Sequence, residues 1–254
     1  MKSIWLSIAL VSVILVTTAV RVAPLAEGGD RLRRQCVSED GYLMLTIARN
    51  IALGNGFSIS DGEIRSNGVQ PLAALIYALC FVVVGGDRLA GLYPVVGLQI
   101  VLSIMTAFML FHAMGKYFYR GPHSQLVAIL AAVAWYVSPT TVMQTQNSLE
   151  TGLCALLILC AITLYDVLAP RLRRTLHPGW CIAFGVMLGV TFLGRNDACL
   201  LIAVLLGVHL ALGFRNGSLG RAVRQSFIIG GASVFTALPW LCFNVSRFGH
   251  IVPV

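Results

Sequence analysis

The sequence predicts an all-α membrane protein, a polytopic transmembrane helical bundle of about seven spans. Hydrophobic residues make up 57% of the 254-residue chain and charged residues only 11%, whereas soluble domains carry about 25% charged residues. Several apolar runs reach roughly 18 residues, enough to cross about 30 Å of hydrocarbon. Such segments must be helical, because lipid offers no partner for an unpaired backbone group. We expect one transmembrane domain over residues 1–254.

The first predicted span covers residues 4–20 and follows Lys2. Its apolar run is long for a signal peptide and no clear A-x-A cleavage site follows it, so we expect an uncleaved helix with a cytoplasmic N-terminus. A bacterial plasma membrane is the expected location.

Residues 24–88 are predicted to form a long outer juxtamembrane loop with two short helices. Ser38 is a typical N-cap residue, and acidic residues in the first turn suit the helix dipole. Gly54 and Gly56 are expected to end this helix. The apolar segment 71–84 is short for a span, at about 14 residues, and suits an interfacial helix.

The remaining apolar runs predict six further spans, and each lies between charged or polar connections. Their ranges are 89–114, 126–142, 151–168, 180–193, 198–214 and 227–245. This layout places the arginine-rich connections 171–174 and 215–224 inside, as the positive-inside tendency requires. It also places every acid except Asp166 outside. If segment 71–84 spanned instead, the acids would be divided between the two faces.

The net charge of +8 has two interpretations. Arginines in short loops set the topology of membrane proteins, or they bind an anionic lipid head group. Arg31, Arg33 and Arg34 remain outside in the predicted layout, where they would suit a lipid phosphate. Nucleic acid is not expected as a partner, because the basic residues are scattered over short loops. The seven cysteines include no C-x-x-C pair, so neither a metal–thiolate site nor a disulfide framework is predicted.

Glu39 and Asp40 are adjacent carboxylates at a predicted helix start near the membrane surface. A carboxylate within hydrogen-bond reach can act as general base toward the hydroxyl of a sugar acceptor. Two carboxylates could also help to hold a divalent cation that offsets phosphate charge. The competing interpretation is a helix cap in a solvated loop.

Three other polar motifs fall on the same predicted face. Glu150 begins the fourth span, and a charge at membrane depth is a candidate functional residue. Arg195 could clamp a phosphate through its planar fork, or pair with Asp197 to close a tight turn. Arg247 follows the last span, and its competing interpretation is an interfacial anchor.

The order of these segments resembles the C-type membrane glycosyltransferases that use polyprenyl-phosphate sugars, such as the protein O-mannosyltransferases, the lipid A aminoarabinose transferases and the mycobacterial arabinofuranosyltransferases. The resemblance covers nearly the whole chain, although each motif is short. The motifs are Glu39-Asp40-Gly41-Tyr42, Ala48-Arg49-Asn50, Gly54-Asn55-Gly56, Gly62-Glu63, Gln70-Pro71-Leu72, Leu149-Glu150-Thr151, Gly194-Arg195-Asn196-Asp197 and Arg247-Phe248-Gly249 through Pro253.

The resemblance implies transfer of a sugar from a polyprenyl-phosphate donor to a hydroxyl of a lipid, glycan or protein, on the outer face of the membrane. Glu39 or Asp40 would be the base, and Glu150 would assist by positioning or through a divalent cation such as Mg²⁺ or Mn²⁺. The donor and acceptor would be bound by residues from several motifs: Tyr42, Arg49, Asn50, Gln70, Arg195, Asp197 and Arg247.

Two features depart from the family pattern. The first acid is Glu39 where the family usually has Asp, and the chain ends at Val254 where such enzymes usually continue, so a truncated product is expected.

The alternative is a non-catalytic membrane protein, such as a truncated paralogue, an assembly partner or a lipid or sugar transporter. A transporter predicts inverted repeats and broken helices near the midplane, and the sequence has neither.

Overall fold

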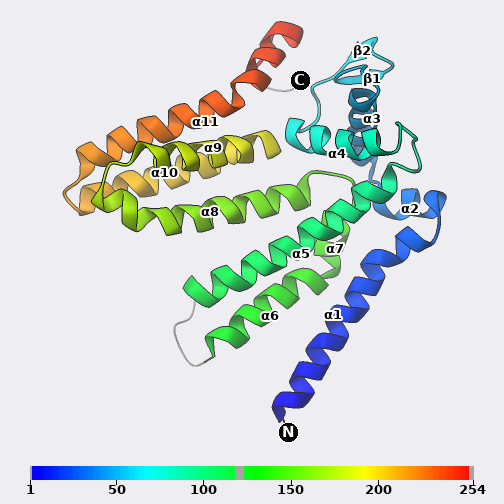
Figure 1. Cartoon of the computed structure of the whole chain (residues 1–254), viewed down its shortest axis with the longest axis horizontal. Coiled ribbons are helices and arrows are strands. Elements are labelled where there is room, and N and C mark those ends of the chain that lie inside the picture. Colours follow the sequence, from blue (N-terminus) through cyan, green and yellow to red (C-terminus); the bar gives the residue numbers. More distant parts are fainter. Residues whose placement is uncertain (1, 118–122, 252–254) are drawn as a thin grey trace. The chain divides into compact units, whose positions relative to one another are not determined.

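The computed structural model describes residues 2–117 and 123–251, with side chains for residues 11–116 and 123–251. The chain divides into two compact units. Unit 1 comprises Met1–Ser66 and Ala73–Leu156, and unit 2 comprises Asn67–Leu72 and Leu157–Val254. Each unit is described by itself. The described part is mostly helical, as the sequence predicts, and Figure 1 gives the order of its elements.

Unit 1 is built on a pair of long antiparallel helices, α5 (Leu92–Tyr117) and α6 (Ser124–Val137). The first helix, α1 (Lys2–Ala26), packs against both of them. A short helix, α7 (Pro139–Thr145), continues α6 after a bend of 59°. Proline at position 139 explains the bend, because it cannot donate the backbone hydrogen bond that would continue the helix.

The segment between α1 and α5 carries the remaining elements of unit 1. These are α2 (Gly29–Cys36), α3 (Glu39–Ala52), the antiparallel hairpin of β1 (Ser58–Ser60) and β2 (Ile64–Arg65), and α4 (Pro71–Val83), which belongs to unit 1 from Ala73. The predicted loop therefore holds three short helices rather than two.

Helix α2 is the element that the sequence analysis assigned to a loop. Its glycines and charges resemble loop composition, yet Arg31 pairs with Glu27 at 3.3 Å and Arg33 pairs with Asp30 at 3.6 Å. Ion pairs at i, i+4 and i, i+3 spacing support a helix. Leu32 is fully buried, which gives α2 a packed face.

Unit 2 is a helical bundle of α8 (Thr151–Arg174), which belongs to it from Leu157, with α9 (Pro178–Gly194), α10 (Ala198–Arg215) and α11 (Leu219–Phe248). Helices α9 and α11 approach closely at glycines. A Cβ added to Gly189 would lie 2.6 Å from the Thr236 Cβ, and one added to Gly185 would collide with the Ile229 carbonyl. Small residues four positions apart are a common helix contact in membranes.

Four described helices are long and apolar enough to cross a membrane: α5 over Leu92–Lys116, α8, α10 and α11. The bent pair of α6 and α7 makes a fifth if it counts as one span. The chain therefore has the helices of an integral membrane protein, with four to five candidate spans in its described part. The predicted number of about seven is not confirmed; α9 and the described apolar part of α1, Val11–Ala26, are shorter than these spans. Helix α4 is also short, as the sequence predicts.

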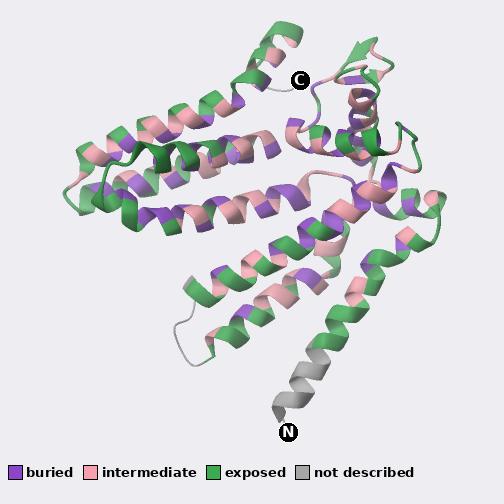
Figure 2. Cartoon of the chain, viewed as in Figure 1, coloured by how far each residue is buried: buried purple, intermediate pink, exposed green. Residues whose placement is uncertain are grey.

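Burial follows the helix faces, as Figure 2 shows. In unit 2 the buried faces of α8, α9, α10 and α11 meet in one apolar cluster that includes Leu168, Phe184, Leu188 and Ile229. Many large apolar side chains on the outer faces are exposed instead, including Phe227 and Phe235. Exposed apolar faces around a packed core suit a bundle surrounded by lipid.

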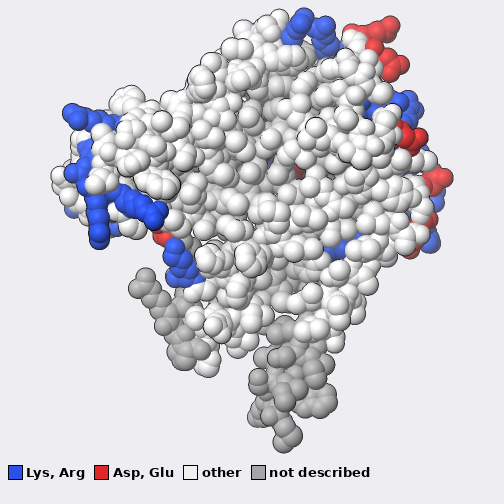
Figure 3. All heavy atoms as spheres, in the orientation of Figure 1, with Lys and Arg blue, Asp and Glu red and all other residues white. Residues whose placement is uncertain are grey.

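Basic residues gather at one end of unit 2, where α8 ends and α11 begins (Figure 3). We call this the basic end, and it contains Arg171, Arg173, Arg174, Arg215, Arg221 and Arg224. Arg221 Nη1 donates to the carbonyls of Arg173 at 2.6 Å and Arg174 at 2.9 Å. The two arginine-rich connections thus lie together, as the predicted layout requires, while their cytoplasmic orientation stays a prediction.

Candidate functional site

Helix α3 begins at the predicted cap. The Ser38 Oγ accepts a hydrogen bond from the Gly41 N–H at 3.1 Å, and Glu39 and Asp40 are exposed in the first turn. The helix ends at Ala52, shortly before Gly54, which has a left-handed φ of 84°. The sequence-based bounds of this helix are therefore confirmed.

The start of α3 is docked on the connection before α8. We call this connection the docking loop and define it as residues 145–150, from the last residue of α7 to the residue before α8. The Asn147 carbonyl accepts hydrogen bonds from the N–H and the Oγ of Ser38, both at 3.1 Å. Ser148 Oγ donates to the Cys36 carbonyl at 2.7 Å. Because α3 approaches so closely, a Cβ at position 41 would lie 2.5 Å from the Asn147 carbonyl oxygen.

Two motifs that are far apart in the sequence are thereby brought together. The acidic pair Glu39–Asp40 begins α3, and Glu150 lies at the end of the docking loop. Ser148 adopts a left-handed φ of 63° within this loop, which is uncommon for a residue other than glycine. Strained backbone of this kind persists only where surrounding contacts hold it.

Glu150 is partly buried and lies close to a hydrogen-bonded group of side chains. The Tyr77 hydroxyl donates to the Leu149 carbonyl at 2.8 Å and accepts from Gln99 Nε2 at 3.0 Å. Burial, with a smaller contribution from the nearby Glu150 carboxylate, raises the pKa of Tyr77. The described residues include no group of three or more His, Cys, Asp or Glu side chains placed to hold a metal. A cation shared by Glu150 and Glu39 or Asp40 stays a prediction.

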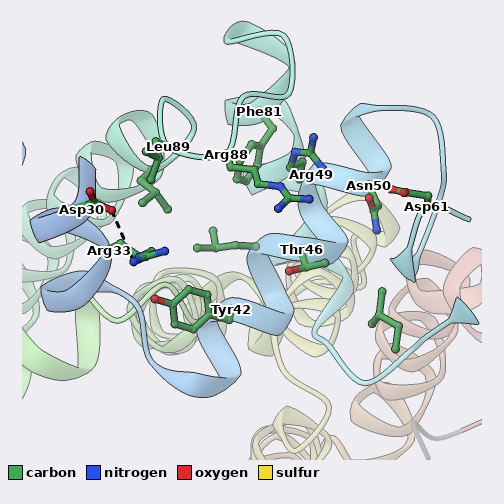
Figure 4. A pocket seen from close by; sticks show the side chains of 13 residues that line it. Asp30, Arg33, Tyr42, Thr46, Arg49, Asn50, Asp61, Phe81, Arg88 and Leu89 are labelled. Carbon is green, nitrogen blue, oxygen red and sulfur yellow. Dashed lines mark ion pairs between the residues drawn. The ribbon is translucent and has the colours of Figure 1, made fainter. Parts of the chain in front are cut away.

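A cavity of about 430 Å³ lies beside α3 and is the candidate site of unit 1 (Figure 4). Helix α3 lines it with one face, because Tyr42, Leu45, Thr46 and Arg49 recur at helical spacing. The other lining residues come from α2, from the end of α3, from the hairpin, from α4, from the turn between α4 and α5, and from the first residue of α5. They are Asp30, Arg33, Asn50, Ile59, Asp61, Phe81, Arg88, Leu89 and Leu92.

Arg49 and Arg88 both line the pocket, and Figure 4 shows their guanidinium groups in the same part of it. Arg49 Nε donates to the Gly86 carbonyl at 2.6 Å, which fixes the direction of its side chain. Asp87 Oδ1 accepts from the N–H groups of Leu89 at 2.9 Å and Ala90 at 2.7 Å. These bonds shape the turn that presents Arg88.

The pocket holds three arginines and two aspartates. Arg33 is paired with Asp30 at 3.6 Å, and among the described residues neither Arg88 nor Asp61 takes part in an ion pair. Like charges repel, so a pocket with two guanidinium groups in the same part favours an anion. Arginine binds phosphate and carboxylate groups through parallel hydrogen bonds.

Three of the predicted binding residues, Tyr42, Arg49 and Asn50, line this pocket. Asn50 has a structural role, because its Nδ2 donates to the Ser58 carbonyl at 2.8 Å and so joins α3 to β1. Neither Glu39 nor Asp40 lines the pocket. Glu39 precedes Tyr42 by three positions and Thr46 by seven, so it shares their side of α3, whereas Asp40 is turned about 100° away.

The other predicted binding residues belong to unit 2. The Asn196 N–H donates to Gln70 Oε1 at 3.3 Å, which joins the Gln70 segment to the turn between α9 and α10. Arg195 Nε lies 3.0 Å from Asp197 Oδ2, as expected if the pair closes this turn. Arg247 is exposed in the last turn of α11. Pro253 lies outside the described residues. A site shared between these residues and the pocket stays a prediction.

Several residues in or near the site carry no predicted role. Asp30, Asp61 and Arg88 line the pocket, but each lies in a polar segment where no periodicity marks it. Arg21, which is fully buried, carried a clear signal, since a charge next to an apolar run is a candidate functional residue.

Comparisons with known protein families, with curated proteins and with solved structures give no match to this chain.

Proposed function

We propose that the chain is a membrane glycosyltransferase that moves a sugar from a polyprenyl-phosphate donor to a hydroxyl of a lipid, glycan or protein acceptor, on the outer face of a bacterial plasma membrane. The observation that supports this proposal is the pocket in unit 1, which Arg49 and Arg88 line together with apolar side chains.

The chemistry of a polyprenyl-phosphate sugar suits this pocket. Its phosphate would take the guanidinium groups of Arg49 and Arg88, and the first apolar units of its chain would contact Leu45, Phe81 and Leu92. Pockets for small molecules commonly have about 300–1,000 Å³, so a cavity of about 430 Å³ accommodates the head group and the start of the chain. The rest of the polyprenyl chain would extend into lipid.

The proposed reaction needs a base and charge stabilisation. The acceptor oxygen attacks the anomeric carbon, its proton passes to a carboxylate, and the bond from that carbon to the phosphate oxygen breaks to release polyprenyl phosphate. Cations fixed beside the phosphate stabilise the charge that develops on the leaving group. Glu39 is the better placed of the two predicted bases, because it shares the pocket side of α3.

One observation favours the alternative, a non-catalytic membrane protein that binds a lipid phosphate. Neither Glu39 nor Asp40 lines the pocket, so the anion site and the predicted base are separate features. In this alternative, the pocket binds the lipid and the acidic pair only caps α3.

The first test measures binding of a long-chain polyprenyl monophosphate to the purified full chain in lipid nanodiscs, with the matching polyprenol as the ligand that lacks phosphate. We expect preference for the phosphate, and we expect Arg49→Gln and Arg88→Gln to weaken it. Arg34→Gln is the matched control, because Arg34 is an exposed arginine of α2 outside the pocket. Equal binding of phosphate and alcohol contradicts both candidate functions.

The second test separates the two candidates. The same preparations are supplied with a panel of radiolabelled polyprenyl-phosphate hexoses and pentoses, and transfer to an acceptor fraction is measured. Transfer that is lost in Glu39→Gln or Asp40→Asn, with lipid binding retained, supports the transferase. If the chain binds the lipid but transfers none of the sugars of the panel, the non-catalytic alternative is supported.

A further inference from the structure

Arg21 is fully buried in unit 1, although its guanidinium group is always charged. It lies near the end of α1 and is surrounded by oxygen atoms and one ring. The two protons of Nη1 are shared among Ser103 Oγ at 3.3 Å, Thr145 Oγ1 at 3.2 Å and Gln146 Oε1 at 3.1 Å. Nη2 donates to the Tyr136 carbonyl at 3.0 Å, and the guanidinium carbon lies 4.7 Å from the centre of the Tyr136 ring.

These partners are all neutral. No carboxylate pairs with Arg21 among the described residues, and its buried Nε has no hydrogen-bond partner there. Burying a charge without a counter-charge is costly. An apolar side chain would be less costly if this position needed only packing. The role of Arg21 should therefore be found among the groups that its guanidinium contacts.

Those contacts lead to the docking loop. Thr145 and Gln146 begin this loop, and Gln146 Nε2 donates back to the Arg21 carbonyl at 3.0 Å, so the two residues hold each other by reciprocal bonds. The next two residues, Asn147 and Ser148, make the hydrogen bonds to Ser38 and Cys36. The buried cation is therefore connected to the start of α3 by hydrogen bonds at both ends of the loop and by the backbone between Gln146 and Asn147.

We propose that Arg21 is a positioning residue that fixes the docking loop and, through it, the start of α3. Helix α3 carries Glu39 and Asp40 in its first turn and the pocket lining, including Tyr42 and Arg49, further along. The purpose assigned to this positioning rests on the proposed function. The positioning of the loop and of α3 by Arg21 is independent of the proposed function, because it depends only on the contacts within unit 1.

The Ser38 N–H reports on this arrangement, since it donates to the Asn147 carbonyl at 3.1 Å. Hydrogen exchange of a peptide that contains Ser38 is measured by mass spectrometry on the full chain in nanodiscs. Local opening sets the exchange rate of such an amide, so we expect Arg21→Met to accelerate it about tenfold. Arg21→Lys keeps the charge but has a single nitrogen, and should give an intermediate rate.

A second pair of variants guards against a failure of Arg21→Met to fold. Gln146→Ala keeps Arg21 and removes its reciprocal partner in the docking loop, and it should also accelerate exchange at Ser38. Thr18→Val is the matched control, because Thr18 lies one turn before Arg21 and its Oγ1 is 3.2 Å from the Tyr136 hydroxyl, without contact to the loop. This control should leave exchange at Ser38 unchanged.

Two results overturn the inference. Unchanged exchange at Ser38 in both Arg21→Met and Gln146→Ala shows that the loop is held without Arg21. Any loss of overall stability accelerates exchange throughout unit 1, so peptides of α5 give the reference value. Acceleration at Ser38 that does not exceed the acceleration in α5 shows general destabilisation rather than positioning. Failure of the proposed function is recognised separately, because polyprenyl monophosphate binding is measured on the wild-type chain and on Arg88→Gln, in which Arg21 is intact.

Discussion

Arginine is used in opposite ways in two regions of the molecule, around Arg21 in unit 1 and at the basic end of unit 2. In both regions a guanidinium group donates to backbone carbonyls, from Arg21 to Tyr136 and from Arg221 to Arg173 and Arg174. Arg21 is 0% exposed, whereas Arg221 is only half-buried and its partners Arg173 and Arg174 are exposed.

The difference shows that burial, rather than the type of side chain, decides how much an arginine contributes to the fold. An exposed guanidinium group exchanges protein partners for water at little cost. A buried one must be surrounded by acceptors, and removal of the cation leaves those acceptors unsatisfied at about 1–3 kcal/mol for each group. The two regions should therefore respond very differently to the same kind of substitution.

Arg21→Met should have the largest effect on stability. Ser103 and Thr145 also bond to each other at 2.9 Å, but the Gln146 Oε1 and the Tyr136 carbonyl would lose the donor that Arg21 provides. We expect the free energy of unfolding to fall by about 2–4 kcal/mol, measured by denaturant titration in mixed micelles. A change below 0.5 kcal/mol, the range of ordinary surface substitutions, would mean that the burial argument is wrong.

Arg88→Gln tests an intermediate case, an arginine that is exposed but shares the pocket with another cation. Because both like charges line the pocket, we expect its stability to be unchanged or slightly raised, while binding of a polyprenyl monophosphate weakens about tenfold or more. Isothermal titration and thermal unfolding of the same preparation measure both quantities. Arg34→Gln should change neither, and loss of binding in that control would indicate a nonspecific charge effect.

The native thiol of Cys36 measures burial in unit 1 without an arginine substitution that would remove a charge. Burial raises the pKa of its thiol from the usual 9.0 to about 11. Only the thiolate reacts, so at pH 8 alkylation in the folded chain should be about a hundredfold slower than in the unfolded chain. The rate should rise as the pH approaches 11. The measurement uses a chain whose other cysteines are replaced by alanine.

The raised pKa of Cys36 also determines whether stability rises or falls with pH. Below pH 9 the Cys36 thiol is protonated in both states and contributes no pH dependence, whereas between pH 9 and about 11 the unfolded chain ionises first. Stability should therefore fall as pH rises through this interval. A flat profile, or alkylation of Cys36 as fast as in the unfolded chain, would show that the thiol is accessible.

Arg221→Gln should have the smallest effect. Its partners are the carbonyls at the exposed end of α8, which water can satisfy, so we expect a loss below about 1 kcal/mol. Thermal unfolding at matched detergent concentration measures it beside Arg21→Met. A loss as large as that of Arg21→Met would remove the distinction between the two regions.

The sequence could predict the features that depend on local chemistry. Ser38 predicts the start of α3 through its cap, and the arginines after α8 and α10 predict that these connections lie at the same end. The pocket could not be predicted in this way, because Asp30, Tyr42, Asp61 and Arg88 meet only through the tertiary packing of segments with no shared periodicity. Helix α2 depends on burial of Leu32, which its polar composition conceals.

The bend between α6 and α7 has a consequence for how this chain can change during evolution. Tyr136 lies in the last turn of α6, where carbonyls have no partner within the helix, and Pro139 prevents the helix from continuing. The acceptor that Arg21 uses therefore exists because of that proline. Substitutions at positions 21 and 139 should be epistatic, so that replacement of Pro139 by a helix former is tolerated best where the arginine has already been lost.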